Sequence, residues 1–82
     1  MTKIIYSKAS KKVLESYEKK LALRIIEGIE SIPLGDLKKL EGKRVPPLYR
    51  LRIGKYRIVY SYLNDDIIQV IKIDTRGDIY KY

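Results

Sequence analysis

The sequence has no cysteine and no histidine. Without cysteine, neither a disulfide framework nor a thiolate metal site can form. Without histidine, the chain lacks the usual general base near neutral pH and the commonest metal ligand. Zinc hydrolases and enzymes built on Ser-His-Asp or Cys-His groups are therefore excluded, and we predict no metal or other cofactor.

Long apolar runs are also absent. The apolar stretch at the N-terminus turns charged at Lys8, which makes it far too short for a signal peptide or a membrane span. We therefore expect a cytoplasmic protein with no membrane partner. At 82 residues, the chain is expected to form one domain over 1–82. Its stability should be modest, because so small a domain buries a limited fraction of its surface.

Positive charge is what the sequence has in excess. Eighteen Lys and Arg residues stand against ten Asp and Glu, for a formal charge of +8. The excess is concentrated between Lys38 and Arg57, where eight basic residues and one acid supply +7 of that total. Such an excess favours a polyanionic partner or an acidic protein partner.

The N-terminal part of the chain is predicted to be helical. From Lys8 to about Ile32 the apolar residues recur at spacings of one, three and four, which places them on a single helical stripe. The pattern fits one long helix or two helices with a bend near Tyr17–Lys20. Ser7 can cap the start, and Pro33 marks the end. The stripe consists of Val13, Leu14, Tyr17, Leu21, Ile25, Ile29 and Ile32.

The remainder predicts short strands and loops. The predicted strands are Lys3–Tyr6, Tyr49–Ile53, Tyr56–Tyr62 and Ile67–Ile73. Gly54-Lys55 suits a two-residue hairpin loop with Gly first, and Asp36–Leu48 is interpreted as a basic loop because of its glycine and prolines. The expected fold is α+β, with a small antiparallel β-sheet and the helical segment, one long helix or a helical hairpin, packed on one face. Its order would be β-α(α)-β-β-β.

Three arginines of the predicted hairpin suggest a phosphate-binding site. The period of two places Arg50 and Arg52 on one face, which we expect to be open to solvent, and Arg57 lies on the partner strand. Paired strands lie about 4.8 Å apart, so these side chains could converge on a site the size of a phosphate. Arginine suits that role because its planar fork binds phosphate through two hydrogen bonds.

Two other interpretations of this region remain open. The arginines could form only a solvated face or pair with nearby acids, namely Asp65, Asp66 and Asp74. The neighbouring tyrosines, Tyr56, Tyr60 and Tyr62, could hold RNA by stacking without cleaving it, although tyrosines in strands more often fill the core or its edges.

The last segment adds Arg76 and Tyr80. A tyrosine ordinarily titrates at about 10, but guanidinium groups beside it favour the phenolate and lower its pKa. Such a tyrosine could take the 2′-hydroxyl proton of RNA. The arginines would stabilise the charge on the pentacoordinate phosphate.

The order of these residues resembles a known family. Residues 40–42 (Leu-Glu-Gly) and 49–60 (Tyr-Arg-Leu-Arg-Ile-Gly-Lys-Tyr-Arg-Ile-Val-Tyr) resemble the L-x-G … Y-R-x-R-x-G-x-Y-R-x-x-Y core of the RelE/ParE superfamily. Residues 73–80 are similar to its closing I-x-H-R-x-x-x-Y motif, and residues 5–9 to its first strand and helix start. The match covers essentially the whole chain and is more specific for the superfamily than for any branch of it.

The resemblance implies a toxin of a toxin–antitoxin pair. One branch of the superfamily enters the ribosomal A site and cuts messenger RNA without a metal, leaving a 2′,3′-cyclic phosphate. On that basis the predicted catalytic residues are Arg57, Arg76 and Tyr80, with Tyr82 as a substitute for Tyr80. The predicted phosphate- and RNA-binding residues are Arg50, Arg52, Lys43, Arg44 and Lys55. The expected partners are messenger RNA, the ribosome and a small acidic or amphipathic antitoxin lying along the basic surface.

The sequence departs from this pattern at informative positions. RelE proper tends to have lysine where this chain has Arg50 and Arg52, and a guanidinium cannot act as a base because it stays charged. Thr75 stands where many relatives have histidine, which excludes a histidine-dependent mechanism. The alternatives are a ParE-like inhibitor of DNA gyrase without catalytic residues, and an inactive or merely RNA-binding relative. The concentration of arginine favours the ribonuclease.

Overall fold

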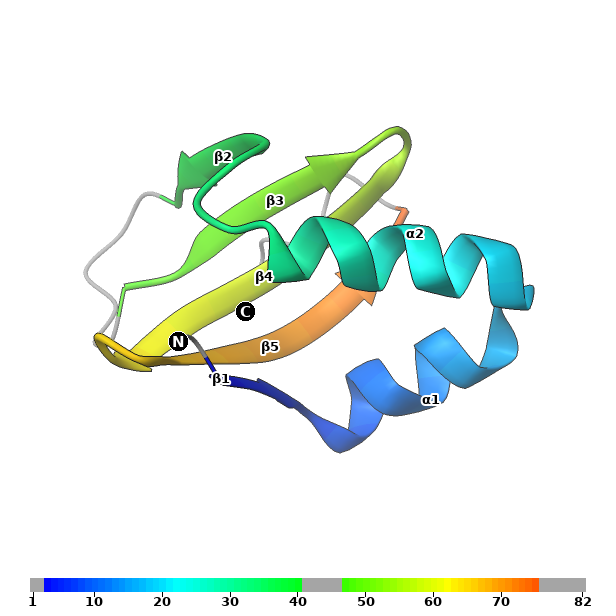
Figure 1. The fold of residues 1–82 in the computed structure, drawn as a ribbon, viewed down its shortest axis with the longest axis horizontal. Helices are drawn as coiled ribbons and strands as arrows, with labels where there is room; N and C mark the ends of the chain where they lie inside the picture. Colours follow the sequence, from blue (N-terminus) through cyan, green and yellow to red (C-terminus); the bar gives the residue numbers. More distant parts are fainter. Residues whose placement is uncertain (1–2, 41–46, 76–82) are drawn as a thin grey trace.

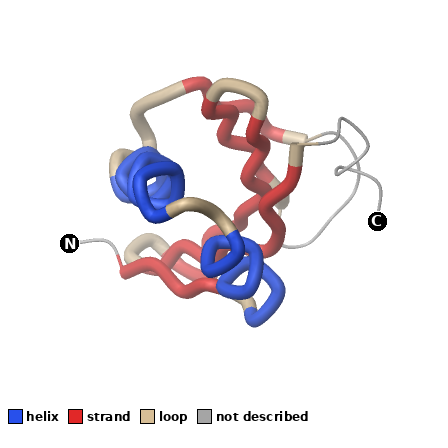
Figure 2. Tube along the Cα trace, turned by 90° about the vertical axis from the view of Figure 1, so that its right-hand side faces the viewer, coloured by secondary structure: helices blue, strands red, loops and turns tan. Residues whose placement is uncertain are grey.

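The computed structural model describes residues 3–40 and 47–75. Its elements are β1 (Lys3–Tyr6), α1 (Lys8–Ser16), α2 (Lys19–Glu30), β2 (Asp36–Lys39), β3 (Tyr49–Ile53), β4 (Tyr56–Asn64) and β5 (Ile67–Asp74) (Figure 1). The strands form one five-stranded sheet in the order β1-β5-β4-β3-β2, and both helices lie on the same side of it (Figure 2). The predicted α+β class, with helices on one face of a small sheet, is confirmed. Neither helix is long and apolar enough to cross a membrane, as far as the described residues go.

The helical segment is two helices and not one. Tyr17 and Glu18 both take extended backbone conformations, with ψ of 154° and 140°, so the helix breaks inside the interval where a bend was expected. One straight helix over the whole segment would be about 36 Å long at 1.5 Å per residue, as long as the longest dimension of the molecule, 35 Å. The break lets α1 pack on β5 while α2 packs on β3, so both halves of the stripe reach the same sheet.

Ser7 caps α1, as predicted, and also ties it to the sheet. Its hydroxyl oxygen accepts the Ser10 N–H at 3.0 Å, which satisfies one of the unpaired donors of the first turn. The same hydroxyl donates to the Ile71 carbonyl at 2.8 Å. Ile71 lies where the β4–β5 register shifts, since Val59 pairs with Lys72 while Tyr60 pairs with Val70. The cap therefore binds a carbonyl at an irregular point of the ladder.

Two features of the sheet differ from the sequence-based expectation. The sheet is mixed and not wholly antiparallel, because β1 runs parallel to β5. The predicted loop from Asp36 to Leu48 was wrong over its first four residues, which form β2 and pair antiparallel with β3. Strand β2 lies at the edge of the sheet and has one apolar residue, Leu37, opposite Leu51. Charges are common on edge strands, and here they hid the strand pattern.

The β3–β4 hairpin has the predicted two-residue loop. Ile53 pairs with Tyr56 across it, and Gly54 has a φ of +59°, which side chains other than glycine's rarely adopt. A two-residue turn whose first residue is a glycine with positive φ matches the right-handed twist of the two strands. This loop therefore fixes which residues of β3 and β4 stand opposite one another.

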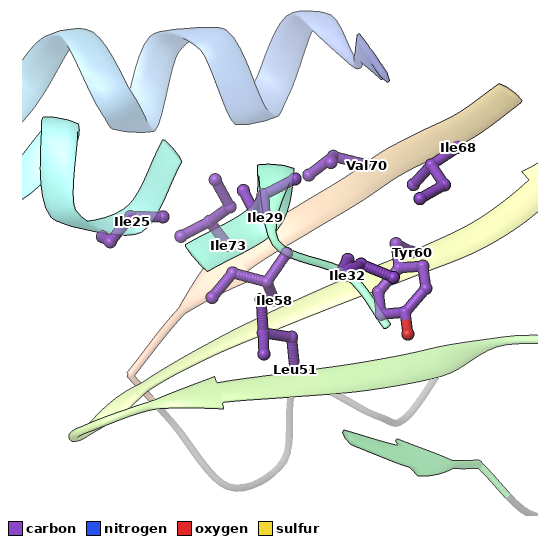
Figure 3. Close-up of a cluster of buried hydrophobic side chains, with 9 residues drawn as sticks. All are labelled: Ile25, Ile29, Ile32, Leu51, Ile58, Tyr60, Ile68, Val70 and Ile73. Carbon is purple, nitrogen blue, oxygen red and sulfur yellow. The ribbon is translucent and has the colours of Figure 1, made fainter. Parts of the chain in front are cut away.

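The core lies between the sheet and the helices (Figure 3). Its buried side chains are Ile25, Ile29, Ile32, Leu51, Ile58, Tyr60, Ile68, Val70 and Ile73. Helix α2 approaches the sheet closely at Gly28, where an added Cβ would lie 2.5 Å from the Ile53 Cδ1. The apolar stripe predicted for the helices faces this core, while Leu23, outside the stripe, is 48% exposed.

Tyrosines fill one end of the core, as expected for strand tyrosines. The Tyr49 ring stacks on the Tyr60 ring at 5.5 Å, and Tyr62 contacts both rings edge-on. Tyr56 meets Tyr17 edge-on at 5.4 Å, beside the break between the helices. Burial raises the pKa of Tyr60, with a further contribution from Tyr62, and burial also raises the pKa values of Tyr6 and Tyr17.

The core assignment predicts a contrast between two substitutions in α2. Ile25→Ala removes a fully buried side chain and should lower the free energy of unfolding by about 2–5 kcal/mol. Leu23→Ala, in the same helix, should change it by no more than about 0.5–1 kcal/mol. Denaturant unfolding followed by circular dichroism measures both. Equal effects would show that the stripe is assigned to the wrong face.

The buried tyrosines predict a loss of stability in alkali. Their pKa values are raised in the folded state, so the unfolded chain releases these protons first, at a pH of about 10. Stability should be independent of these groups below that pH and fall as the pH rises above it. Unfolding free energies measured from pH 8 to pH 11 test this, with Tyr60→Phe expected to flatten the fall. A fall that begins well below pH 9 would contradict the assignment.

Candidate phosphate-binding surface of the sheet

One face of the sheet is turned away from the helices, and we call it the outer face. Leu51 and Ile58 pair directly across β3 and β4 and point into the core. Because successive residues of a strand point to opposite faces, their neighbours Arg50, Arg52 and Arg57 belong to the outer face. The predicted grouping of these three arginines on one face is what the strand register produces.

Two rows of side chains cross the outer face from β2 to β5. The arginine row is Asp36, Arg52, Arg57 and Asp74, each directly opposite the next. The lysine row is Lys38, Arg50, Val59 and Lys72, paired in the same way. Directly opposed residues have Cβ atoms about 5 Å apart, so the cations of the two rows surround an area of phosphate size.

The arginine row places two cations side by side. Arg52 stands directly opposite Arg57, and like charges in that position destabilise a sheet. Asp36 and Asp74 at the ends of the row offset part of the repulsion. A pair of facing guanidinium groups is the arrangement that a bound anion would stabilise, because each can give a phosphate two parallel hydrogen bonds.

Arg52 and Arg57 are each anchored by a hydrogen bond from a guanidinium nitrogen to a backbone carbonyl. Arg52 donates from Nε to the Gly54 carbonyl at 3.2 Å. Arg57 donates from Nη1 to the Thr75 carbonyl at 3.1 Å, and the Thr75 N–H donates to Asp74 Oδ1 at 2.6 Å. These bonds orient both guanidinium groups and use one of the five N–H donors that each possesses.

Arg50 differs from the expectation of a solvent-open side chain. Only 12% of its side chain is exposed, and its Nη1 lies 3.3 Å from Asp36 Oδ1. The expectation was wrong because Asp36, expected in a loop, lies on β2 alongside β3 and contacts Arg50. Among the acids expected as alternative partners, Asp74 does stand opposite Arg57, whereas Asp65 and Asp66 lie in the β4–β5 turn.

The structure adds two lysines that the sequence did not assign to this face. Lys38 was expected in a loop, and it stands opposite Arg50. Lys72 was expected in a strand buried on both sides, where a strict period of two would place it with Val70 in the core. The register shift at Ile71 turns Lys72 to the outer face, opposite Val59, and returns Ile73 to the core. A lysine inside a strand that is apolar at most positions was the available signal.

Lys55 is not brought to the arginines. It lies in the hairpin loop, and its Nζ stands 5.6 Å from the centroid of the Tyr56 ring, which packs against the core on the helix side. The other predicted site residues, Lys43, Arg44, Arg76 and Tyr80, and the substitute base Tyr82, lie outside the described residues. Their roles stay predictions.

A second feature of the described surface lies near the start of α2. A hollow of about 490 Å³ is lined by Glu18, Lys20, Leu21 and Arg24, and it shares no residue with either row. No group of three His, Cys, Asp or Glu side chains that could hold a metal ion occurs within residues 3–40 and 47–75. The tyrosines whose pKa burial raises, Tyr6, Tyr17 and Tyr60, are poor bases because their phenolate forms are disfavoured.

Comparison with known proteins identifies the family of the chain. Residues 4–80 match the family described as ParE toxin of type II toxin–antitoxin system, parDE. The chain belongs to the RelE/ParE family of toxins. It is 40% identical over 62 residues, 70% of this chain and 67% of the relative, to a protein of Methanocaldococcus jannaschii that bears the name RelE1.

Two solved complexes of this toxin family are similar in structure. The archaeal RelE–RelB complex of Pyrococcus horikoshii OT3 contains a chain with a TM-score of 0.73 and 32% identity, covering 93% of this chain and 96% of that one. The RelB–RelE antitoxin–toxin complex of Methanococcus jannaschii contains one with a TM-score of 0.69 and 29% identity, covering 95% and 96%. The fold of this chain is thus RelE-like.

The arrangement of the arginine row predicts stabilisation by anions. At constant ionic strength, sulfate should raise the unfolding temperature, because it binds the folded state between Arg52 and Arg57. At a concentration ten times its dissociation constant, the gain would be about 1.4 kcal/mol. Arg57→Gln should remove most of this gain. Lys19→Gln, an equal loss of charge on α2, should retain it, and loss of the gain in both variants would argue against a site.

Proposed function

We propose that this toxin is a ribosome-dependent endoribonuclease that cuts messenger RNA in the A site, without a metal, by attack of a 2′-hydroxyl group. The observation that supports the proposal most strongly is the direct cross-strand pairing of Arg52 with Arg57, with Arg50 beside them on the same face. Facing guanidinium groups repel each other and reduce stability, so their pairing favours a site for a bound anion. A phosphodiester removes that repulsion.

The chemistry requires a base, an acid and charge stabilisation. The base removes the proton of the 2′-hydroxyl, O2′ attacks the adjacent phosphorus, and the bond from phosphorus to O5′ breaks as the leaving oxygen takes a proton from a water molecule. The products carry a 2′,3′-cyclic phosphate and a 5′-hydroxyl. In the proposal Arg52 and Arg57 bind the non-bridging oxygens, on which negative charge grows in the transition state, and this is often the largest catalytic contribution.

The base of the proposal comes from the end of the chain. Arg76 would stabilise the negative charge of the phosphate together with the arginines of the hairpin. Tyr80, or Tyr82 in its place, would accept the 2′-hydroxyl proton. Neither Arg50 nor Arg52 can do so, since a guanidinium stays charged. Lys43 and Arg44 would contact RNA beyond the scissile phosphate.

The proposal also includes an antitoxin. The similar chains from Pyrococcus and Methanococcus were solved as complexes with RelB. We propose an acidic or amphipathic partner of the same kind for this chain, in agreement with its charge of +8. By covering or neutralising the outer face, such a partner would prevent RNA from reaching the arginines.

A second candidate is inhibition of DNA gyrase, because the matching family description is that of the ParE toxin. This function would make no use of the arginine row as a phosphate site. A supercoiling assay with purified gyrase decides it if messenger RNA stays intact.

Primer extension on a defined messenger RNA in a reconstituted translation reaction tests the main proposal. We expect cuts within codons at the A site, and none without ribosomes. Arg57→Ala should slow cutting by about 10²–10³-fold, the loss typical of removing one group that stabilises transition-state charge. Arg24→Ala makes the same change on the exposed surface of α2. If only the outer face reacts, this variant should cut messenger RNA at a rate within about twofold of that of the unmodified toxin.

Thermal unfolding of both variants establishes that they are folded. An uncut message, or cutting by Arg57→Ala at the rate of the unmodified toxin, would overturn the ribonuclease proposal. The supercoiling assay would then distinguish a gyrase inhibitor from an inactive relative.

A further inference from the structure

Asp36 occupies a position between two arginines of the outer face. It stands directly opposite Arg52 on the neighbouring strand, and its Oδ1 lies 3.3 Å from Arg50 Nη1. The Asp36 side chain is 60% exposed, whereas that of Arg50 is 12% exposed. A carboxylate at the solvent boundary thus holds a guanidinium that is otherwise covered.

The contact between Asp36 and Arg50 is incomplete. Arg50 Nη1 is buried and makes no hydrogen bond with any of the residues that the structure describes, although Asp36 is close enough for an ion pair. A buried N–H without an aligned acceptor costs free energy. Asp36 therefore neutralises Arg50 without a hydrogen bond to Nη1, and an anion aligned with that donor would gain the free energy of this missing bond.

A phosphate of RNA is such an anion. It carries the same charge as the carboxylate and accepts two parallel hydrogen bonds from one guanidinium. The carboxylate and the phosphate would repel each other if both stood against Arg50, since both are negative. One must leave when the other binds.

We propose that Asp36 is an intramolecular stand-in for an RNA phosphate at Arg50, and that RNA binding displaces it. This inference rests on the proposed function in naming RNA as the ligand, but it concerns binding and not cleavage. Asp36 lowers the affinity of the outer face for RNA, because part of the binding free energy is spent on breaking the ion pair. The β2 strand thereby sets how tightly the toxin holds its substrate.

The test is the affinity for a short single-stranded RNA whose 2′-hydroxyl groups are all methylated, so that 2′-hydroxyl attack cannot cut it. Fluorescence anisotropy of a labelled strand reports the dissociation constant over a range of salt concentrations. Asp36→Asn should tighten binding about fivefold, the upper end for a surface ion pair. Because the same phosphates are contacted once Asp36 is displaced, the dependence of log K on log salt should keep the slope of the unmodified toxin.

Asp65→Asn is the matched control, because it makes the same change of charge in the β4–β5 turn. Asp65 is six residues along the chain from Val59, the neighbour of Arg50, which corresponds to about 20 Å of strand. That exceeds the screening length of about 8 Å at physiological salt. The Asp65→Asn variant should therefore have the RNA affinity and the salt dependence of the unmodified toxin. In an Arg50→Gln background, Asp36→Asn should tighten RNA binding no more than Asp65→Asn does.

The inference is overturned if Asp36→Asn binds no tighter than Asp65→Asn, if its gain survives in the Arg50→Gln background, or if no variant binds the RNA. Asp36→Ser serves as the second variant should Asp36→Asn fail to fold by thermal denaturation. Failure of the proposed function looks different. In that case the methylated RNA binds with the expected difference between variants, while unmodified messenger RNA stays intact in the translation reaction.

Discussion

The register of the β3–β4 hairpin is the constraint on which the rest of this structure depends. A two-residue loop that begins with Gly54 in the positive-φ region joins the strands and makes Arg52 the partner of Arg57 and Leu51 the partner of Ile58. A slip of one residue would exchange the two faces of a strand. It would expose the centre of the core and bury the arginines, so the same loop determines both stability and chemistry.

The two faces of the sheet have different roles, one in stability and the other in binding. Isoleucines from α2 and from β4 and β5 fill the side that the helices cover, while cations that repel one another gather on the other side. Such repulsion reduces a stability that is already limited by chain length. The Asp36 carboxylate contacts Arg50, the Thr75 carbonyl accepts a hydrogen bond from Arg57, and Asp74 stands opposite Arg57. We interpret the surface as one prepared for a polyanion and restrained by its own acids until that polyanion arrives.

The sequence predicted most of this arrangement because the signals were local. Period-two alternation identified the hairpin, its glycine identified the loop, and spacing identified the helical stripe. What it missed depends on contacts between distant segments. Strand β2 has a single apolar residue and is defined by its pairing with β3. The parallel pairing of β1 with β5 joins the two ends of the described chain. Lys72 reaches the outer face only through a register shift, and the burial of Arg50 follows from a strand that the sequence pattern did not show.

The central claim is that the outer face of the hairpin binds the phosphates of RNA, and NMR spectroscopy of the arginine side chains tests it most directly. The Nε–Hε signals of the toxin would be followed while uncleavable single-stranded RNA is added. The account predicts that the signals of Arg50, Arg52 and Arg57 shift together and saturate at the same RNA concentration, while that of Arg24 on α2 stays in place. Shifts confined to Arg24, with the three hairpin arginines unchanged, would contradict the account and move the binding surface to the helices.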